Sequence, residues 1–198
     1  MSYIFYFMGK SSSGKDTLFK RVRESMPELK IIVGYTTRPI RANEMDGREY
    51  FFVSREKMQE MEDKHQVIEK RAYHTVHGVW NYFTADDGQV KGNEENYILI
   101  GTLESFVKIR DYYGIDKVIP IYIQVDDGIR LKRALEREMQ QENPKYAEMC
   151  RRYLADMEDF KEENIKECQI EKRFENDDLD VCLKEICQYI REVCHGYK

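Results

Sequence analysis

The stretch YIFYFMGKSSSGK, residues 3–15, decides the fold of this chain. Its first part, Tyr3–Met8, is an unbroken apolar run, which is typical of a strand buried on both faces of a sheet. A loop of small residues follows over Gly9–Gly14, and apolar residues then recur at helical spacing over 16–25 until Pro27 ends the pattern. A strand, a loop bounded by glycines and a helix in this order predict a phosphate-binding loop.

The chemistry of this loop suits a triphosphate. The glycines at its two ends accept unusual dihedrals and let a phosphate approach the backbone closely. The loop amides and the N-terminus of the following helix point at the anion, and a lysine at the end can reach the β- and γ-phosphates. The alternative, a strand–helix turn that binds nothing, does not explain why spacing, lysine and context occur together. The predicted ATP-binding residues here are Gly9, Ser11, Ser12, Ser13, Gly14 and Lys15, and Lys15 is also predicted to be catalytic.

The position after Lys15 departs from the general pattern, which has serine or threonine there as a magnesium ligand. This chain has Asp16 and then Thr17. Asp16 could bind Mg²⁺ directly or through water, or it could be a first-turn acid that the helix dipole favours. The two interpretations stay open. We therefore expect Mg²⁺ with ATP as the cofactor, Asp16 as its candidate ligand and Thr17 as a further ATP-binding residue.

Strands and helices alternate along the rest of the chain. Strands are predicted at 30–33, 49–54, 97–101, 118–125 and 169–174, helices at 55–64, 103–113, 127–137, 151–166 and 180–195, and an antiparallel region at 67–84. This alternation predicts an α/β fold with a mainly parallel sheet and helices on both faces. No repeat or linker divides the chain. We expect one domain over 1–198, with a core of 1–33 and 95–198 and an acceptor-binding insertion at about 34–90.

Composition excludes several classes of function. The formal net charge is −5, which disfavours nucleic acid or an anionic membrane as the main partner. The N-terminal apolar run is too short to cross a membrane, and no basic region precedes it as in a secretory signal. The five cysteines form no C-x-x-C pair, which indicates reduced thiols in a cytoplasmic protein; a zinc site that includes His195 is the less favoured alternative.

A second informative stretch begins at Thr36 with TTRPIRANE and continues at Gly47 with GREYFFVS. Two arginines three residues apart can present paired forks to one phosphate. The order of the phosphate loop, T-T-R-x-x-R-x-x-E and G-x-x-Y-x-F-V-S resembles the guanylate kinase family, from Tyr3 to about Tyr189. The resemblance implies a P-loop NTPase-type fold with a helical lid at about 130–155. It also implies phosphoryl transfer from ATP to a nucleoside monophosphate, with GMP as the first acceptor to test.

The resemblance also implies an acceptor site. Arg38, Arg41 and Tyr50 would hold the acceptor phosphate, and Glu44 would support their loop. Glu69, in the sequence Val67-Ile68-Glu69, would read the guanine edge, because guanine offers adjacent N–H donors to a carboxylate. The alternative for Glu69 is an ordinary surface acid.

On the ATP side, the resemblance implies that Asn176 lies near the adenine, although a helix-capping loop would explain the same residue. Arginines at 130, 133 and 137 precede the polar segment 138–149, which is predicted to be mobile, and arginines at 151 and 152 follow it. Arginines that close over a transferred phosphoryl group stabilise its charge. We expect Arg137 and Arg152 to be the catalytic pair; the alternative for each is a surface ion pair along its helix.

Three departures from the family pattern concern the acceptor. The Asp-x-Asp pair expected after the acceptor subdomain is absent; Thr102 falls where the second carboxylate belongs and is a candidate acceptor contact, and Asp16 could supply the missing charge. A serine before T-T-R is replaced by Gly34-Tyr35. The family's Tyr-Tyr-Gly-Thr is replaced within 74–82, where His77 could hold phosphate or be structural. Two other functions therefore stay open: a kinase for another phosphorylated acceptor such as a ribose phosphate, and a catalytically weak nucleotide-binding module.

Overall fold

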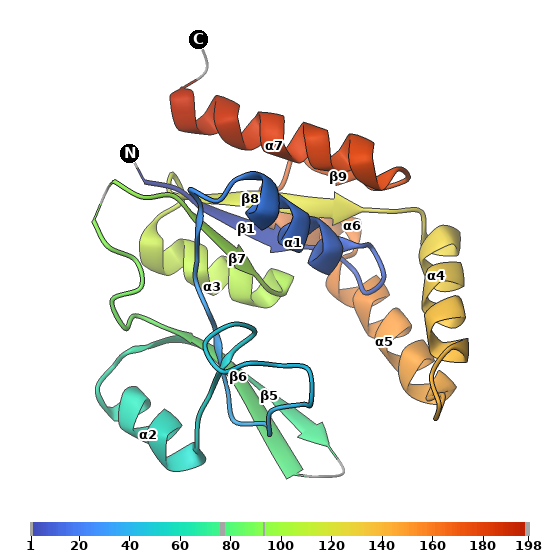
Figure 1. Ribbon diagram of the computed structural model, residues 1–198, viewed down its shortest axis with the longest axis horizontal. Coiled ribbons are helices and arrows are strands. Elements are labelled where there is room, and N and C mark those ends of the chain that lie inside the picture. The colour runs from blue at the N-terminus through green and yellow to red at the C-terminus, as the bar shows by residue number, and fades with distance from the viewer. Residues whose placement is uncertain (1, 76–77, 93, 197–198) are drawn as a thin grey trace.

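A parallel sheet forms the centre of the structure (Figure 1). Its strand order is β2-β7-β1-β8-β9, and every neighbouring pair is parallel. The strands are β1 (Ile4–Met8), β2 (Lys30–Ile31), β7 (Tyr97–Ile100), β8 (Val118–Gln124) and β9 (Arg173–Glu175). The computed structural model describes residues 2–75, 78–92 and 94–196. The central position of β1 explains its continuous apolar run.

Helices cover both faces of this sheet because alternate side chains of a strand point in opposite directions. Phe5 and Phe7 of β1 share a core with α1 (Lys15–Ser25) and α7 (Leu179–His195). Tyr6 and Met8 share a core on the other face with α3 (Leu103–Tyr113) and α6 (Glu162–Glu167). The predicted α/β fold with helices on both faces is confirmed.

A second, smaller sheet contains the stretches TTRPIRANE and GREYFFVS or lies beside them. Its order is β4-β3-β6-β5, and the strands are β3 (Tyr35–Thr36), β4 (Phe51–Phe52), β5 (Val67–Thr75) and β6 (Gly78–Ala85). The helix α2 (Arg55–Asp63) packs on it through Met58 and Met61. β5 and β6 are antiparallel, as predicted, but β3 and β4 are parallel. The loop that joins β3 and β4 carries TTRPIRANE and brings the chain back in the same direction, so the sheet is mixed.

Two helices, α4 (Asp127–Met139) and α5 (Tyr146–Asp159), lie side by side at one end of the molecule (Figure 1). The single helix predicted at 151–166 is wrong, because the chain turns after Asp159 and α6 begins at Glu162. The turn buries Phe160, whose ring stacks on Tyr122 with centroids 5.7 Å apart. α5 also begins earlier than predicted, so the polar segment between the two helices is only 140–145.

Other local predictions agree closely with the structure. The Ser54 hydroxyl caps α2 by accepting a hydrogen bond from the Lys57 amide at 3.1 Å, as its position before the helix predicts. β9 forms at the end of its predicted range and extends beyond it to Glu175. All five cysteines are free thiols. Across 2–75, 78–92 and 94–196, we find no helix that combines the length and the apolar character a membrane crossing needs.

Candidate active site

The loop between β1 and α1 has a glycine at each end, at positions where a side chain would clash with its surroundings. A Cβ atom at Gly9 would lie 2.5 Å from the backbone oxygen of Ile123. Gly14 has a φ of +86°, and a Cβ atom there would overlap the side-chain amide of Asn176. Ser12 is also left-handed, with a φ of 64°. The loop is therefore held in an unusual conformation by close backbone packing.

Asn176 supports this loop from behind. It follows β9, its residue is 2% exposed, and its amide nitrogen donates to the Ser13 carbonyl at 2.7 Å. The Asn176 side-chain oxygen and the hydroxyls of Ser12 and Ser13 are buried without a hydrogen-bond partner in the described part of the chain. The structure thus places Asn176 against the loop backbone. Its contact with adenine stays a prediction.

Lys15 and Asp16 begin α1 at the mouth of the loop. The Lys15 ammonium lies 3.0 Å from the Asp16 carboxylate, and the Asp16 side chain is 83% exposed. Thr17 is also exposed. Because the Asp16 carboxylate is exposed to solvent, the pair can separate at little cost, since surface ion pairs contribute about 0–1 kcal/mol. Lys15 is therefore available to a phosphate and Asp16 to a cation.

The two end helices α4 and α5 are tied to the loop by buried charge. Arg130 of α4 is 1% exposed, and its guanidinium donates to the Ser11 carbonyl at 3.3 Å and to Asp156 of α5 at 3.2 Å. Asp156 also accepts from the Ser11 amide at 2.7 Å. Arg152 donates to the Ser11 hydroxyl at 3.1 Å. Arg130 was among the arginines noted in the sequence but not among the predicted site residues, and Asp156, four residues after Arg152 on the same helix, was not predicted.

A cavity of about 490 Å³ lies where the loop after β1, the end helices and the loop between β3 and β4 meet. Its lining includes Ser11 and Ser12 of the first loop, Arg137 and Arg152 of the end helices, and Arg41 of the loop between β3 and β4. The structure brings together cationic side chains from three separate segments. Such a cluster stabilises the spread negative charge of phosphates.

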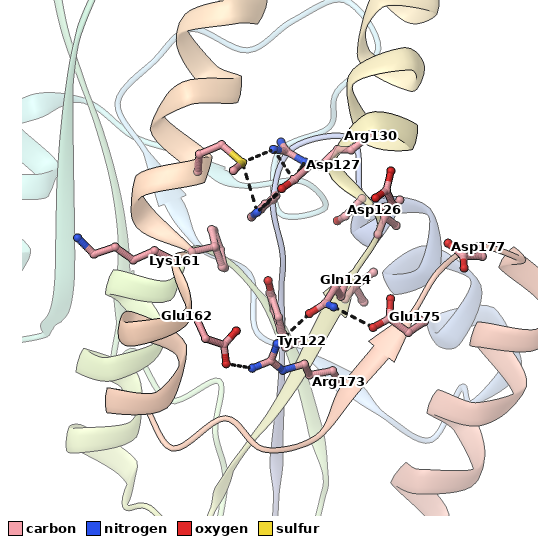
Figure 2. Close-up of a pocket in the computed structure, with 16 residues that line it drawn as sticks. Tyr122, Gln124, Asp126, Asp127, Arg130, Lys161, Glu162, Arg173, Glu175 and Asp177 are labelled. Atoms are coloured by element: carbon pink, nitrogen blue, oxygen red, sulfur yellow. Dashed lines mark hydrogen bonds and ion pairs between the residues drawn. The ribbon is translucent and has the colours of Figure 1, made fainter.

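A slightly larger cavity, of about 540 Å³, lies below the loop between α4, the end of α5 and β9 (Figure 2). Its charged groups pair with one another. Lys10 and Arg130 both contact Asp127, at 3.1 and 3.0 Å, and Glu162 pairs with Arg173. Because these cations already have carboxylate partners, this cavity is a poorer phosphate site than the one lined by Arg41, Arg137 and Arg152.

Arg38 and Glu44 form a buried pair within the acceptor motif. The guanidinium donates to the two Glu44 oxygens at 2.7 and 2.6 Å, and its Nε donates to the Tyr82 hydroxyl at 3.0 Å. Glu44 also accepts from the Arg41 amide at 2.9 Å. The hydrogen bond from Arg38 lowers the pKa of Glu44 to about 2. The pair fixes the loop that carries Arg41, and Arg41 lines the cavity of about 490 Å³.

Two tyrosines flank this pair. The rings of Tyr50 and Tyr82 meet edge to face, with centroids 5.4 Å apart. Burial, and then the neighbouring Tyr82, raise the pKa of Tyr50, so its phenol stays a neutral donor. Tyr82 was not predicted as a site residue; the order Asn81-Tyr82-Phe83-Thr84, which is close to the family's Tyr-Tyr-Gly-Thr, could have indicated it. His77 lies outside the described residues.

Glu69 is fully enclosed. Its side chain is 0% exposed, and it accepts from Thr84 at 2.9 Å and from two nitrogens of Arg71 at 3.0 and 3.2 Å. Arg71 also approaches the Thr102 hydroxyl at 3.4 Å. Arg71 was not predicted as a site residue. Arg71 lies two residues after Glu69 on the same strand, and this spacing, which places both side chains on one face, could have indicated it.

We predict that Gly14→Ala weakens ATP binding by at least about tenfold, because the added methyl group displaces Asn176 and forces a strained φ that costs roughly 1–3 kcal/mol. Calorimetric titration with ATP measures the effect. Gly88→Ala is the matched control, since Gly88 has a φ of +85° and no atom within 4 Å of the added Cβ. Equal ATP affinity in the two variants would contradict the role of the Asn176 contact.

We predict that Glu44→Gln destabilises the protein by about 1–3 kcal/mol at neutral pH, since it removes a charged acceptor from a buried arginine. Because the pKa of Glu44 is lowered from 4.5 to about 2, its contribution is complete above 4.5 and is lost as the pH falls toward 2. Urea unfolding at several pH values measures the difference. A difference that stays constant down the acid range would show that the pair is not responsible.

Comparisons with known proteins agree with this geometry. The family model described as guanylate kinase matches residues 4–193. The guanylate kinase of Koribacter versatilis is 32% identical over 133 residues, which cover 66% of this chain and 56% of that protein. That of Thermotoga maritima is 27% identical over 187 residues, which cover 94% of this chain and 77% of that protein.

One solved structure shows the same fold. The crystal structure of guanylate kinase from Anaplasma phagocytophilum matches with a TM-score of 0.63 at 20% identity, covering 100% of this chain and 87% of that one. The aligned part of this chain spans little more than half of the Koribacter versatilis protein. The family model covers nearly all of the residues from the first strand to the last helix, and the chain belongs to the guanylate kinase family.

Proposed function

We propose that this chain transfers the γ-phosphoryl group of ATP to GMP and releases ADP and GDP. The observation that carries the proposal is the shared cavity lined by Ser11, Ser12, Arg41, Arg137 and Arg152. It joins a phosphate loop to an acceptor motif across one space, so two phosphorylated substrates can meet end to end. Family membership supports the same activity, since the relatives described above are named guanylate kinases.

The chain's own residues have separate tasks in this reaction. The loop over Gly9–Gly14 and Lys15 hold the β- and γ-phosphates. Arg41 and Tyr50 hold the acceptor phosphate as donors, and the Arg38–Glu44 pair positions them. Arg137 and Arg152 neutralise charge that develops on the transferred group. No side-chain nucleophile is required, because positioning and charge neutralisation lower the barrier.

The residues at the mouth of the loop fit Mg²⁺ bound to ATP. Mg²⁺ usually keeps several waters and takes one or two carboxylates together with substrate phosphates. Among the residues the structure describes, no group of three or more His, Cys, Asp or Glu side chains could hold a metal alone, and Asp16 is the exposed acid next to Lys15. Asp16 would hold the ion, with Thr17 beside it. When bound, Mg²⁺ would neutralise charge on the phosphate oxygens.

The domain division follows from the same proposal. Residues 34–90 would form the acceptor-binding part, residues 130–155 would form a lid, and 1–33 with 95–198 would form the core. Arg130 and Asp156 form a salt bridge, and each also makes a hydrogen bond to the Ser11 backbone. These contacts support a lid that responds to what is bound at the loop. A cytoplasmic location stays a prediction.

The activity is tested with purified protein, ATP and Mg²⁺, offered GMP, dGMP, AMP, UMP, CMP or ribose phosphates while ADP release is followed. We expect turnover with GMP and dGMP, and a fall in kcat of about 100-fold or more for Lys15→Ala, since the ammonium acts on the reacting phosphates. Turnover with a ribose phosphate and none with GMP would contradict the proposal. Binding of GMP without any turnover would instead identify a nucleotide-binding module.

We predict that Asp16→Ala raises the Mg²⁺ concentration needed for half-maximal turnover by about tenfold, because it removes the exposed carboxylate next to Lys15. Calorimetric titration of ATP with and without Mg²⁺ gives a readout independent of activity. Asp180→Ala is the control, since Asp180 is also an exposed acid in the first turn of a helix. If Asp16→Ala only lowers stability by about 0.3–1 kcal/mol, as a helix-dipole acid would, Asp16 is not the ligand.

A further inference from the structure

Ser11, in the loop between β1 and α1, makes polar contacts with both end helices. Its amide donates to the Asp156 carboxylate at 2.7 Å, its carbonyl accepts from Arg130 at 3.3 Å, and its hydroxyl accepts from Arg152 at 3.1 Å. Asp156 and Arg152 belong to α5, and Arg130 belongs to α4. The amide, the carbonyl and the side chain of this one loop residue are therefore all engaged by the two helices.

Asp156 joins these contacts to one another. One of its carboxylate oxygens, Oδ2, accepts from the Ser11 amide and also from Arg130 Nη1, the latter at 3.2 Å. The Asp156 side chain is 16% exposed, and the Arg130 side chain is 1% exposed. An ionised carboxylate only accepts hydrogen bonds, whereas an amide N–H and a guanidinium only donate them. Asp156 can therefore hold the loop backbone and Arg130 together.

The charges beside the loop balance only when Asp156 is counted. Arg130 also contacts Asp127 of α4 at 3.0 Å, and Asp127 contacts Lys10, the residue before Ser11, at 3.1 Å (Figure 2). The Lys10 side chain is 16% exposed, so both cations are largely buried. Asp156 supplies the second carboxylate. Without its charge the two cations would share Asp127, and a buried charge that loses its partner disturbs the structure around it.

The place of Arg152 depends on this arrangement through the geometry of α5. Asp156 lies four residues after Arg152, and residues at that spacing share one face of a helix. That face is turned toward Ser11, since both side chains contact it. Arg152 itself is exposed, and a long exposed side chain keeps much rotamer freedom. The contact of Asp156 with the loop therefore sets where Arg152 enters the cavity of about 490 Å³.

We propose that Asp156 is a positioning residue for phosphoryl transfer, because it holds α5 on the loop at Ser11 and so places Arg152 at the transferred group. This inference rests on the proposed function and deepens it. Asp156 is not part of the cavity lining that includes Arg152, so it acts through the arginine and not on a substrate. A displacement of about 1 Å in a charge-stabilising group can cost about 100-fold in rate, so Asp156 can affect kcat from outside the cavity.

The test is a double-mutant cycle of Asp156→Asn and Arg152→Ala, with kcat and KM measured for GMP in the presence of ATP and Mg²⁺. Asp156→Asn keeps the size of the side chain and an oxygen that can accept from Ser11, but it removes the charge that faces Arg130. We expect it to lower kcat by about tenfold or more and to leave KM for GMP within about twofold, since the proposed acceptor contacts lie elsewhere. Arg152→Ala should lower kcat by about 100-fold.

The double variant separates positioning from general stabilisation of the fold. If Asp156 acts through Arg152, the double variant should have a kcat within about threefold of Arg152→Ala alone, because no arginine is left to place. Two effects that multiply would show that Asp156 acts independently of Arg152 and would overturn the inference. Asp159→Asn is the matched control, since Asp159 is an exposed acid on the same helix and lines a different cavity. Its kcat should equal that of the unchanged protein.

Exchange of the Ser11 amide hydrogen with solvent, followed by NMR on the protein without nucleotides, gives a readout that needs no activity. The contact with Asp156 predicts exchange at least about tenfold slower than in an unstructured peptide. Asp156→Ala has no acceptor at this position, so the same amide should exchange faster in that variant. If the substituted proteins do not fold, the unchanged protein decides alone: exchange of its Ser11 amide at the rate of an unstructured peptide would overturn the inference.

The failure of the proposed function has a different signature. Phosphorylation of a ribose phosphate in place of GMP, with a cycle in which the double variant again matches Arg152→Ala, would support the inference and overturn GMP as the acceptor. Effects that multiply, with GMP turned over normally by the unchanged protein, would overturn the inference and leave GMP phosphorylation standing. Absence of turnover with every acceptor would overturn both.

Discussion

The hydrogen bond from the Asn176 side chain to the Ser13 carbonyl links the first loop of the chain to its last strand. The loop needs this support because Ser12 and Gly14 both have left-handed backbones, and a non-glycine residue in that state costs roughly 1–3 kcal/mol. The surrounding packing must hold such a conformation. Asn176 reaches the loop because β9 extends the sheet beside β8, and Asn176 follows directly. The C-terminal third of the chain therefore helps to hold the loop between β1 and α1.

The cavity of about 490 Å³ is lined by like charges from separate segments of the chain. Arg41 comes from the loop between β3 and β4, and Arg137 and Arg152 come from α4 and α5. Glu138 and Glu148 lie in the same lining and reduce the repulsion among the arginines. Bound phosphates would reduce it further.

Much of the fold could be predicted from local patterns. The apolar run before Gly9, the small residues of the loop and the spacing around Leu103–Tyr113 all act within a few residues, and the structure agrees with them. The break between α5 and α6 could not be foreseen, because it depends on Phe160 stacking on Tyr122 of a distant strand. The parallel pairing of β3 and β4 likewise depends on the path of the loop between them.

The residues of the candidate site also divide into those that local motifs predict and those that depend on contacts between distant segments. Arg41, Arg137 and Arg152 were chosen from motif order, and the structure places all three around one cavity. Arg71, Tyr82 and Asp156 were missed because their roles come from neighbours across a strand or on another element. Glu69 illustrates the limit most clearly. Its sequence position suggests a base reader, but only the fold shows that Thr84 and Arg71 enclose it.

The central claim is that ATP and the acceptor nucleotide occupy one continuous cavity. The most direct test is the binding of a bisubstrate molecule, adenosine and guanosine joined through five phosphates, measured by calorimetry. If both sites share the cavity, this molecule should bind at least about 100-fold more tightly than either ATP or GMP alone, because one linked ligand fills both subsites. An affinity no higher than that of ATP alone would contradict the account.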